Sequence, residues 1–156
     1  MRKDFVSYLH NAMKSNSNLF VITGDLGYGI LDPIRRDFPD RFINVGSAEM
    51  LMLGVAVGLS YSGYTPVCYS ITPFLLYRPF EMIRNYVNFE KIPVKLVGSG
   101  RDHDYAHDGI THWGDDDMKI LTCLPNIKCY KPEELTDDIL KEFITSPGPC
   151  YINLKR

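Results

Sequence analysis

Short apolar runs rich in β-branched residues alternate with helix-like segments along almost the whole sequence. Runs such as Leu19–Thr23 (LFVIT) and 93–99 (PVKLVGS) have the length and composition of buried strands, whereas Phe5, Leu9 and Met13 recur at helical spacing. Strands that alternate with helices predict a parallel sheet, because each helix returns the chain to the same edge of the sheet. We therefore expect a single three-layer α/β domain over residues 1–156, with a mostly parallel central sheet and helices on both faces.

The same pattern predicts where a ligand would bind. In open parallel sheets, ligands lie beyond the carboxyl ends of the strands. The loops expected there are 24–29, 45–49, 70–74 and 98–114, and they contain most of the unusual residues in the chain. The predicted strands are 19–23, 41–45, 65–70, 93–99, 126–130 and 149–154, and the predicted helices lie around 5–13, 31–37, 48–62, 74–90, 115–124 and 132–145.

Charge and composition narrow the class of partner. The 17 Lys and Arg and the 19 Asp and Glu give a formal net charge of -2, and the basic residues are scattered. Nucleic acid or an anionic membrane surface would require a basic stripe, and no segment is apolar for long enough to cross a bilayer. We therefore expect a small-molecule substrate or protein partners, no nucleic acid and no membrane.

The cysteines indicate the cellular compartment in which the protein works. None of the four forms a CxxC pair, and each lies in or beside an apolar segment, as a buried thiol would. Free thiols and the lack of a continuous apolar leader segment are typical of a protein of the reducing cytoplasm. The four are Cys68, Cys123, Cys129 and Cys150.

One carboxylate stands out. Glu49 is the only charged residue between Arg41 and Arg78, and it opens a run of Met, Leu, Val, Ala and Gly that should be buried. Burying an unpaired carboxylate costs several kcal/mol, so a fold keeps one where it is paired, protonated or used. Glu49 could cap the helix that follows, or it could be held for proton transfer, and composition leaves both open.

Two further groups of residues have more than one interpretation. The loop RDHDYAHDGITHWGDDD (101–117) contains three of the four histidines, and it fits a polar substrate pocket better than a metal site or a merely solvated loop, because no metal-ligand spacing is present. Phe74, Tyr77 and Phe80 recur three residues apart, which is usual for a core stripe but would also suit stacking on a planar ring. The glycine-rich GDLGYG (24–29) fits a tight strand-to-helix turn better than a phosphate-binding turn, because it is neither GxGxxG nor a Walker loop and Asp25 would repel an anion.

Three motifs follow one another: the segment from RFINVGSAEM to PFEMIR (41–84), DGITHW (108–113) and LPNIKCYKPEE (124–134). In this order they resemble the pyrimidine-binding domain of the transketolase family of thiamine diphosphate enzymes. The resemblance covers essentially the whole chain. It implies the fold of that domain and thiamine diphosphate as the cofactor.

The resemblance implies a cofactor site when it is carried over position by position. Glu49 matches the glutamate that hydrogen-bonds N1′ of the cofactor's aminopyrimidine, which lets the ring amino group remove the C2 proton of the thiazolium. Phe74, Tyr77 and Phe80 match the aromatic residues that stack on or surround the pyrimidine. The apolar setting of Glu49 would then exclude water from the shared proton.

The resemblance also implies substrate contacts. Asp108 and His112 match residues that contact hydroxyls of the donor substrate, and we expect His112 to take part in catalysis. Arg2 and Arg156 match arginines that bind a sugar phosphate. Two more histidines of the same loop, His103 and His107, are expected to contact the substrate; no residue of this chain is expected to bind metal.

Several positions depart from the family pattern. Met50 and Leu51 replace the usual glutamine and a polar residue, Ile110 replaces a proline, and Gly29 stands where a phosphate-binding serine is common. These departures leave the donor and acceptor substrates open.

The chain also lacks the GDG…N signature of the family's diphosphate-binding domain, and it lacks the small third domain. The resemblance therefore implies half of a cofactor site. We expect a separate diphosphate-binding subunit that holds Mg²⁺ or Ca²⁺, and an α2β2 hetero-oligomer.

The function implied by the resemblance is that of the pyrimidine-binding subunit of a split, transketolase-like transferase, active only with its partner. It would move a two-carbon ketol unit between sugar phosphates or related aldehydes. Two alternatives stay open at this point: a subunit of a 2-oxoacid decarboxylase, and a non-catalytic relic that only binds a partner.

Overall fold

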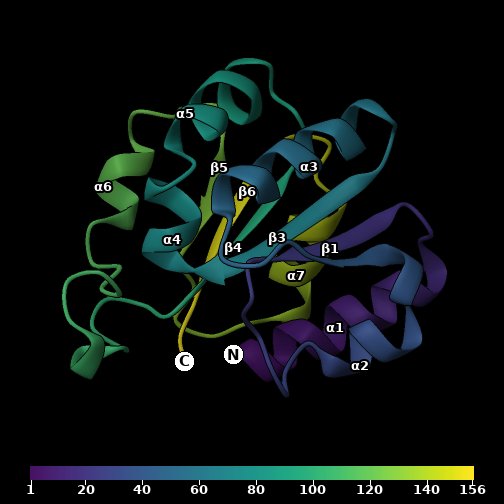
Figure 1. Cartoon of the computed structure of the whole chain (residues 1–156), viewed down its shortest axis with the longest axis horizontal. Helices are drawn as coiled ribbons and strands as arrows, with labels where there is room; N and C mark the ends of the chain where they lie inside the picture. The colour runs from purple at the N-terminus through teal and green to yellow at the C-terminus, as the bar shows by residue number, and fades with distance from the viewer.

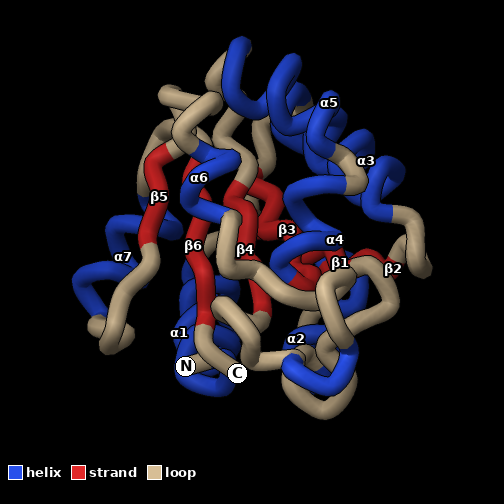
Figure 2. The backbone as a smooth tube through the Cα atoms, turned by 90° about the vertical axis from the view of Figure 1, so that its left-hand side faces the viewer, coloured by secondary structure: helices blue, strands red, loops and turns tan.

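A six-stranded sheet forms the centre of the protein, and all of its strands run parallel (Figures 1 and 2). The computed structural model describes residues 1–156, and the strand order is β2-β1-β3-β4-β6-β5. The expected α/β fold is thus confirmed, and each strand overlaps a predicted run. The strands are β1 Leu19–Thr23, β2 Phe42–Asn44, β3 Thr65–Ile71, β4 Lys95–Ser99, β5 Lys128–Tyr130 and β6 Cys150–Leu154.

Helices cover both faces of the sheet, as predicted, and each face has its own apolar core (Figure 1). One core lies under α1, α2 and α7, and the other under α3, α4, α6 and the π-helix η2. The helices are α1 Arg2–Ser15, α2 Asp32–Asp37, α3 Glu49–Tyr61, α4 Thr72–Tyr77, α5 Phe80–Met82, α6 Asp117–Leu121 and α7 Asp137–Thr145, with 3-10 turns η1 Pro39–Arg41 and η3 Ala106–Asp108 and the π-helix η2 Ile83–Phe89. None of the helices combines the length and the apolar character needed to span a bilayer.

Two predicted helices differ from the structure. The single helix expected over 74–90 is interrupted after Tyr77, because Pro79 has no N–H with which to continue the helical hydrogen bonds, and it continues as α5 and a π-helix. The helix expected from Pro132 begins at Asp137 instead. The side chain of Thr136 caps it by accepting a hydrogen bond from the backbone N–H of Ile139 at 3.3 Å.

The strand order places a ligand crevice near β1 and β3. From β1 the chain adds β2 on one side of the sheet and then β3 on the other, so the direction of winding changes between β1 and β3. Ligands bind at such switch points, beyond the carboxyl ends of the strands. The segment after β2 begins α3 with Glu49, and the segment after β3 forms α4 with Phe74, so both come to this end of the sheet.

The cysteines are all free, but one prediction about them is wrong. Cys68 and Cys150 are buried and Cys129 is partly buried, whereas Cys123 is exposed. Cys123 follows the last turn of α6, where only Leu121 and Leu124 point inward.

Candidate functional site

Glu49 lies deep at the carboxyl end of the sheet. It is the first residue of α3, and only 3% of its surface is exposed. A Cβ atom on Gly24 would lie 3.6 Å from Glu49 Oε1, so the carboxylate packs against the bare backbone that follows β1. The N-cap residue of α3 is Ala48, and no side chain caps the helix. The carboxylate is therefore buried without a capping role.

The partner of Glu49 is Arg78, which lies 29 positions further along the chain. Arg78 Nη1 donates a hydrogen bond to Glu49 Oε1 at 2.8 Å, and the two side chains form an ion pair. The guanidinium carbon of Arg78 also lies 3.7 Å from the centre of the Phe74 ring, a close cation–π contact. A buried carboxylate and an aromatic face thus hold a flat N–H donor between them.

His112 joins this group from the Asp/His/Gly loop. Its ring packs edge-on against Phe74, with 4.8 Å between the ring centres, and its Nδ1 lies 2.9 Å from Thr111 Oγ1. The ring of Tyr105 lies 6.0 Å from that of His112. The structure therefore brings together Glu49, Phe74 and His112, three residues that the sequence singled out.

A small pocket of about 100 Å³ lies next to Tyr105, between the start of α1 and the ends of β3 and β4. Arg2, Tyr69 and Ser99 line it, and Tyr105 Oη lies 3.4 Å from Ser99 Oγ. Arg2 Nε and the Tyr69 hydroxyl are buried without a hydrogen-bond partner. Burial raises the pKa of Tyr69, so its hydroxyl stays a neutral donor. We call these four residues the anion pocket, since unpaired donors and a guanidinium suit an anionic group.

Arg156 lies on the outer side of the anion pocket. Its guanidinium carbon is 4.8 Å from the centre of the Tyr105 ring, and its backbone N–H donates to Asp104 Oδ2 at 2.8 Å. Arg2 lines the pocket beside Tyr105 and Arg156 packs over the Tyr105 ring, although the two arginines stand at opposite ends of the sequence.

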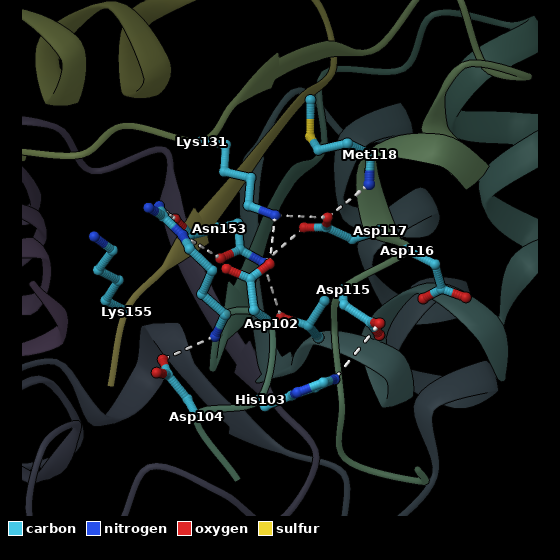
Figure 3. Close-up of polar contacts among 12 residues, drawn as sticks. Asp102, His103, Asp104, Asp115, Asp116, Asp117, Met118, Lys131, Asn153 and Lys155 are labelled. Carbon is cyan, nitrogen blue, oxygen red and sulfur yellow. Dashed lines mark hydrogen bonds and ion pairs between the residues drawn. The ribbon is translucent and has the colours of Figure 1, made fainter. Parts of the chain in front are cut away.

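The other predicted substrate residues are on the exposed part of the loop. His107 and Asp108 belong to the short turn η3 and are exposed, with no side-chain partner among the observed hydrogen bonds. His103 lies 3.5 Å from Asp115 (Figure 3). Its ring packs on that of Trp113 with 4.3 Å between ring centres. The structure has no group of three or more His, Cys, Asp or Glu side chains placed to hold a metal ion.

Tyr77 and Phe80 lie toward α6. With Ile120 and Cys123 they line an open, apolar cavity of about 400 Å³. The hydroxyl of Tyr77 donates to Asp116, and burial followed by this hydrogen bond raises the pKa of Tyr77. Of the three aromatic residues of the predicted stripe, Phe74 is the one whose ring packs on Arg78 and His112 beside Glu49.

A buried polar network supports the loop from behind, and nothing in the sequence pattern pointed to it (Figure 3). Asp117 is fully buried, and its Oδ2 accepts hydrogen bonds from the Tyr151 hydroxyl at 2.8 Å and from Asn153 Nδ2 at 2.7 Å. Its Oδ1 lies 3.5 Å from Lys131 Nζ. Asp117 is also the first residue of α6, inside the predicted helix 115–124, and its carboxylate is buried because β6 presents two donors to it.

The same network holds Arg101, which is 2% exposed. Arg101 Nη2 donates to the carbonyl oxygens of Asn153 at 2.7 Å and of Pro132 at 2.9 Å. These bonds explain why the segment at Pro132 is not helical, since its carbonyl is turned toward β6 and the loop. Arg101 therefore ties the start of the loop to the end of the sheet.

Two residues of the site itself were also missed, Arg78 and Tyr105. A signal for Arg78 was present, because it is the first charge after Glu49 in a long uncharged segment and carries the opposite sign. Tyr105 had no such signal: it is one aromatic residue in a polar loop, and only the fold places it between His112 and the anion pocket.

Comparison with known proteins gives one consistent result. Residues 1–156 match the family model described as "Transketolase, pyrimidine binding domain". The chain is 31% identical to a putative transketolase C-terminal section of Methanocaldococcus jannaschii, and the match covers 100% of the chain and 50% of the relative. It is also 31% identical to one of the subunits of an apulose-4-phosphate transketolase of Actinobacillus succinogenes, over 92% of the chain and 47% of the relative.

A solved structure agrees with these relatives. The structure described as "Split gene transketolase, inactive beta4 tetramer" superposes with a TM-score of 0.85 at 30% identity, over 99% of this chain and 51% of that one. The chain thus spans about half the length of these relatives.

Proposed function

Because this chain belongs to the family of transketolase pyrimidine-binding domains, we propose that it is the pyrimidine-binding part of a split, thiamine diphosphate-dependent transferase. The reaction proposed is the transfer of a two-carbon ketol unit between sugar phosphates or related aldehydes. Members of the family are thiamine diphosphate-dependent transferases.

The observation that carries the proposal is the slot formed by Glu49 and Phe74. It already accepts one flat group that donates N–H bonds, the guanidinium of Arg78, which is held by the carboxylate at 2.8 Å and by the ring at 3.7 Å. An aminopyrimidine has the same needs, a planar face to stack and a ring nitrogen to share a proton with a carboxylate. The residues present therefore fit the pyrimidine of the cofactor.

The chain's own residues would then have separate roles in the reaction. Thiamine diphosphate, when bound, supplies a carbon nucleophile that attacks carbonyl groups. Glu49 would hold a proton at N1′ in a site that water does not reach, Phe74 would orient the ring, and His112 would hydrogen-bond a substrate hydroxyl beside it. Tyr77 and Phe80 are proposed to enclose the cofactor from the side of α6.

The anion pocket supports a phosphorylated substrate. Arg2 and the Tyr69 hydroxyl offer donors that have no partner in the protein, and Tyr105 connects this pocket with His112. A substrate with a carbonyl at one end and a phosphate at the other would fit along this line, its phosphate at Arg2 and Arg156. Asp108 and the two exposed histidines, His103 and His107, are proposed to contact the substrate from the loop.

We propose that a separate chain supplies the diphosphate-binding domain. Its metal ion, Mg²⁺ or Ca²⁺, would bind the cofactor's diphosphate there, and two copies of each chain would form an α2β2 assembly. The relatives support this arrangement by their names, since they include one subunit of a transketolase, a C-terminal section and a split-gene transketolase. The small third domain of the family would likewise lie outside residues 1–156.

The proposal is tested by reconstitution. This chain is copurified with a candidate diphosphate-binding subunit, and cofactor affinity and ketol transfer from a ketose phosphate are measured for the wild type and for Glu49→Gln. The amide keeps the shape of Glu49 but cannot carry the proton, so we expect turnover to fall by roughly 10²- to 10⁴-fold, the usual contribution of acid–base catalysis.

Glu81→Gln is the matched control, because Glu81 is an exposed glutamate on α5, and we expect it to leave turnover unchanged. Equal cofactor affinity and equal turnover for Glu49→Gln and the wild type would contradict the proposal. Consumption of a 2-oxoacid in place of the ketose phosphate would assign the decarboxylase alternative instead.

A further inference from the structure

Arg78 occupies the space in which the proposed function places the cofactor ring. Its guanidinium lies between the Glu49 carboxylate and the Phe74 face, at 2.8 Å from Glu49 Oε1 and 3.7 Å from the ring centre. We propose that Arg78 is an internal, displaceable ligand of this slot, which closes it in the cofactor-free chain and sets the apparent affinity for the incoming ring. This inference rests on the proposed function for the identity of that ring.

The two sides of the ion pair differ in their freedom to move. The side chain of Arg78 is 48% exposed, whereas that of Glu49 is 3% exposed. A guanidinium that leaves the slot is rehydrated at once, but the carboxylate has no route to water and would be left buried. Arg78 is therefore the group that moves, and Glu49 stays in place.

The backbone places Arg78 at a break between helices. α4 ends at Tyr77, and Pro79 prevents the helix from continuing through Arg78 to α5. The long side chain of Arg78 reaches the slot from this corner, and its only side-chain hydrogen bond is the one to Glu49. A change of side-chain rotamer is enough to open the slot, and the core beneath α4 does not have to repack.

Arg78 and a second planar group cannot share the slot. At 3.7 Å the guanidinium is in van der Waals contact with the Phe74 face, and it uses a carboxylate oxygen that the ring nitrogen would need. With such competition, the apparent association constant equals the intrinsic one multiplied by the fraction of molecules in which the slot is open. If Arg78 is in the slot about nine-tenths of the time, the incoming ring binds about tenfold more weakly than its contacts allow.

Displacement also selects what can enter. When Arg78 leaves, Glu49 loses its countercharge while staying buried, so the incoming group must supply an N–H donor or a proton at the same position. A planar ring with neither an N–H donor nor a basic nitrogen that takes up a proton at that edge would gain the aromatic contact but leave the carboxylate unpaired. The slot is therefore selective for donors of the amidine type.

The test uses two probes with the full chain and no partner subunit. The affinities of 4-amino-2-methylpyrimidine and of methylguanidinium are measured by calorimetry for the wild type and for Arg78→Ala. We expect both probes to bind Arg78→Ala about tenfold or more tightly than the wild type. Arg84→Ala is the matched control: Arg84 is exposed, contacts Asn85, and its removal should leave both affinities at the wild-type value.

A second variant guards against an altered fold. Arg78→Lys keeps the charge but loses the planar fork, and it should give an affinity between those of the wild type and Arg78→Ala. Circular dichroism confirms that each variant is folded. Unchanged or weaker binding of methylguanidinium to both variants overturns the inference.

The outcomes separate this inference from the proposed function. A gain for methylguanidinium without any binding of the aminopyrimidine supports displacement of Arg78 and refutes the assignment of the slot to the cofactor. A gain for both probes, combined with full turnover of Glu49→Gln in the reconstituted pair, supports the displacement and refutes the proposed role of Glu49 in proton transfer.

Discussion

Replacement of Asp117 by alanine should cost this fold a large share of its stability. Asp117 is fully buried, and its Oδ2 accepts hydrogen bonds from Tyr151 at 2.8 Å and from Asn153 at 2.7 Å. Asn153 Nδ2 also lies 3.3 Å from Thr72 Oγ1, which donates to the carbonyl of Gly100 at 2.7 Å. Asp117→Ala therefore removes the acceptor at the centre of the network behind the loop.

The expected magnitude follows from these contacts. A hydrogen bond to a charged group contributes about 1.5–3 kcal/mol. The substitution removes the two bonds from β6 and also those that Lys131 Nζ and the backbone N–H of Met118 donate to Oδ1. Asn153 Nδ2 still has Thr72 Oγ1 as an acceptor, so the Tyr151 hydroxyl is the main donor left without a partner. Removing one partner of a buried charged pair costs about 3–5 kcal/mol, and we therefore expect the free energy of unfolding to fall by about 4 kcal/mol.

Urea denaturation followed by circular dichroism measures this loss. With a slope of about 2 kcal/mol per M, the unfolding midpoint should fall by about 2 M. Asp115→Ala is the control. The Asp115 side chain is 51% exposed and its one ion pair, with His103 at 3.5 Å, lies at the surface, so its loss should change the free energy of unfolding by at most about 1 kcal/mol.

A double-mutant cycle distinguishes the network from simple loss of packing. Tyr151→Phe removes only the hydroxyl, so in the Asp117→Ala background it should cost less than in the wild type, by about 1 kcal/mol or more. Additive losses, or a loss for Asp117→Ala no greater than that for Asp115→Ala, would show that the network does not stabilise the loop in this way.

Two further changes test other parts of the structure. Hydrogen bonds from Arg36 and then His10 lower the pKa of Asp37 from 3.8 to about 2, so this contribution to stability is present above pH 3.8 and is lost as the pH falls toward 2. Asp37→Asn should therefore flatten the acid side of a melting-temperature profile, and an unchanged slope there would contradict the ion pair. At Gly98 a methyl group would lie 2.8 Å from the Tyr151 hydroxyl, so Gly98→Ala should lower the free energy of unfolding by about 1–3 kcal/mol in urea denaturation. An unchanged free energy of unfolding would mean that the Tyr151 hydroxyl moves aside without cost.

Local pattern predicted most of the fold. Helical spacing and short β-rich runs depend on neighbouring residues, and they placed all six strands and the two helical layers. Pro132 shows where local pattern fails, because proline followed by two glutamates is a good helix start in isolation. Its carbonyl instead accepts a hydrogen bond from Arg101, a residue 31 positions earlier, and no local signal could indicate that contact.

The candidate site also contains residues that the sequence indicated and residues that only the fold brings into place. Glu49 stood out because a charge in an apolar run is visible in the sequence, and the structure confirms that it is buried. That Arg78 fills the slot depends on how the fold brings the residue after α4 to the first residue of α3, which the sequence does not specify. Tyr105 likewise acquires its place only when the loop folds back over the ends of β3 and β4.

The position of the chain ends has a practical consequence for protein engineering. Arg2 lines the anion pocket, Arg156 lies over its Tyr105, and both ends are adjacent in Figure 1. A purification tag at either end would therefore leave the chain at the rim of the pocket. Joining the ends through a short linker and reopening the chain at exposed Lys91, in the segment before β4, would move both new ends and any tag to the amino ends of the strands, away from the pocket.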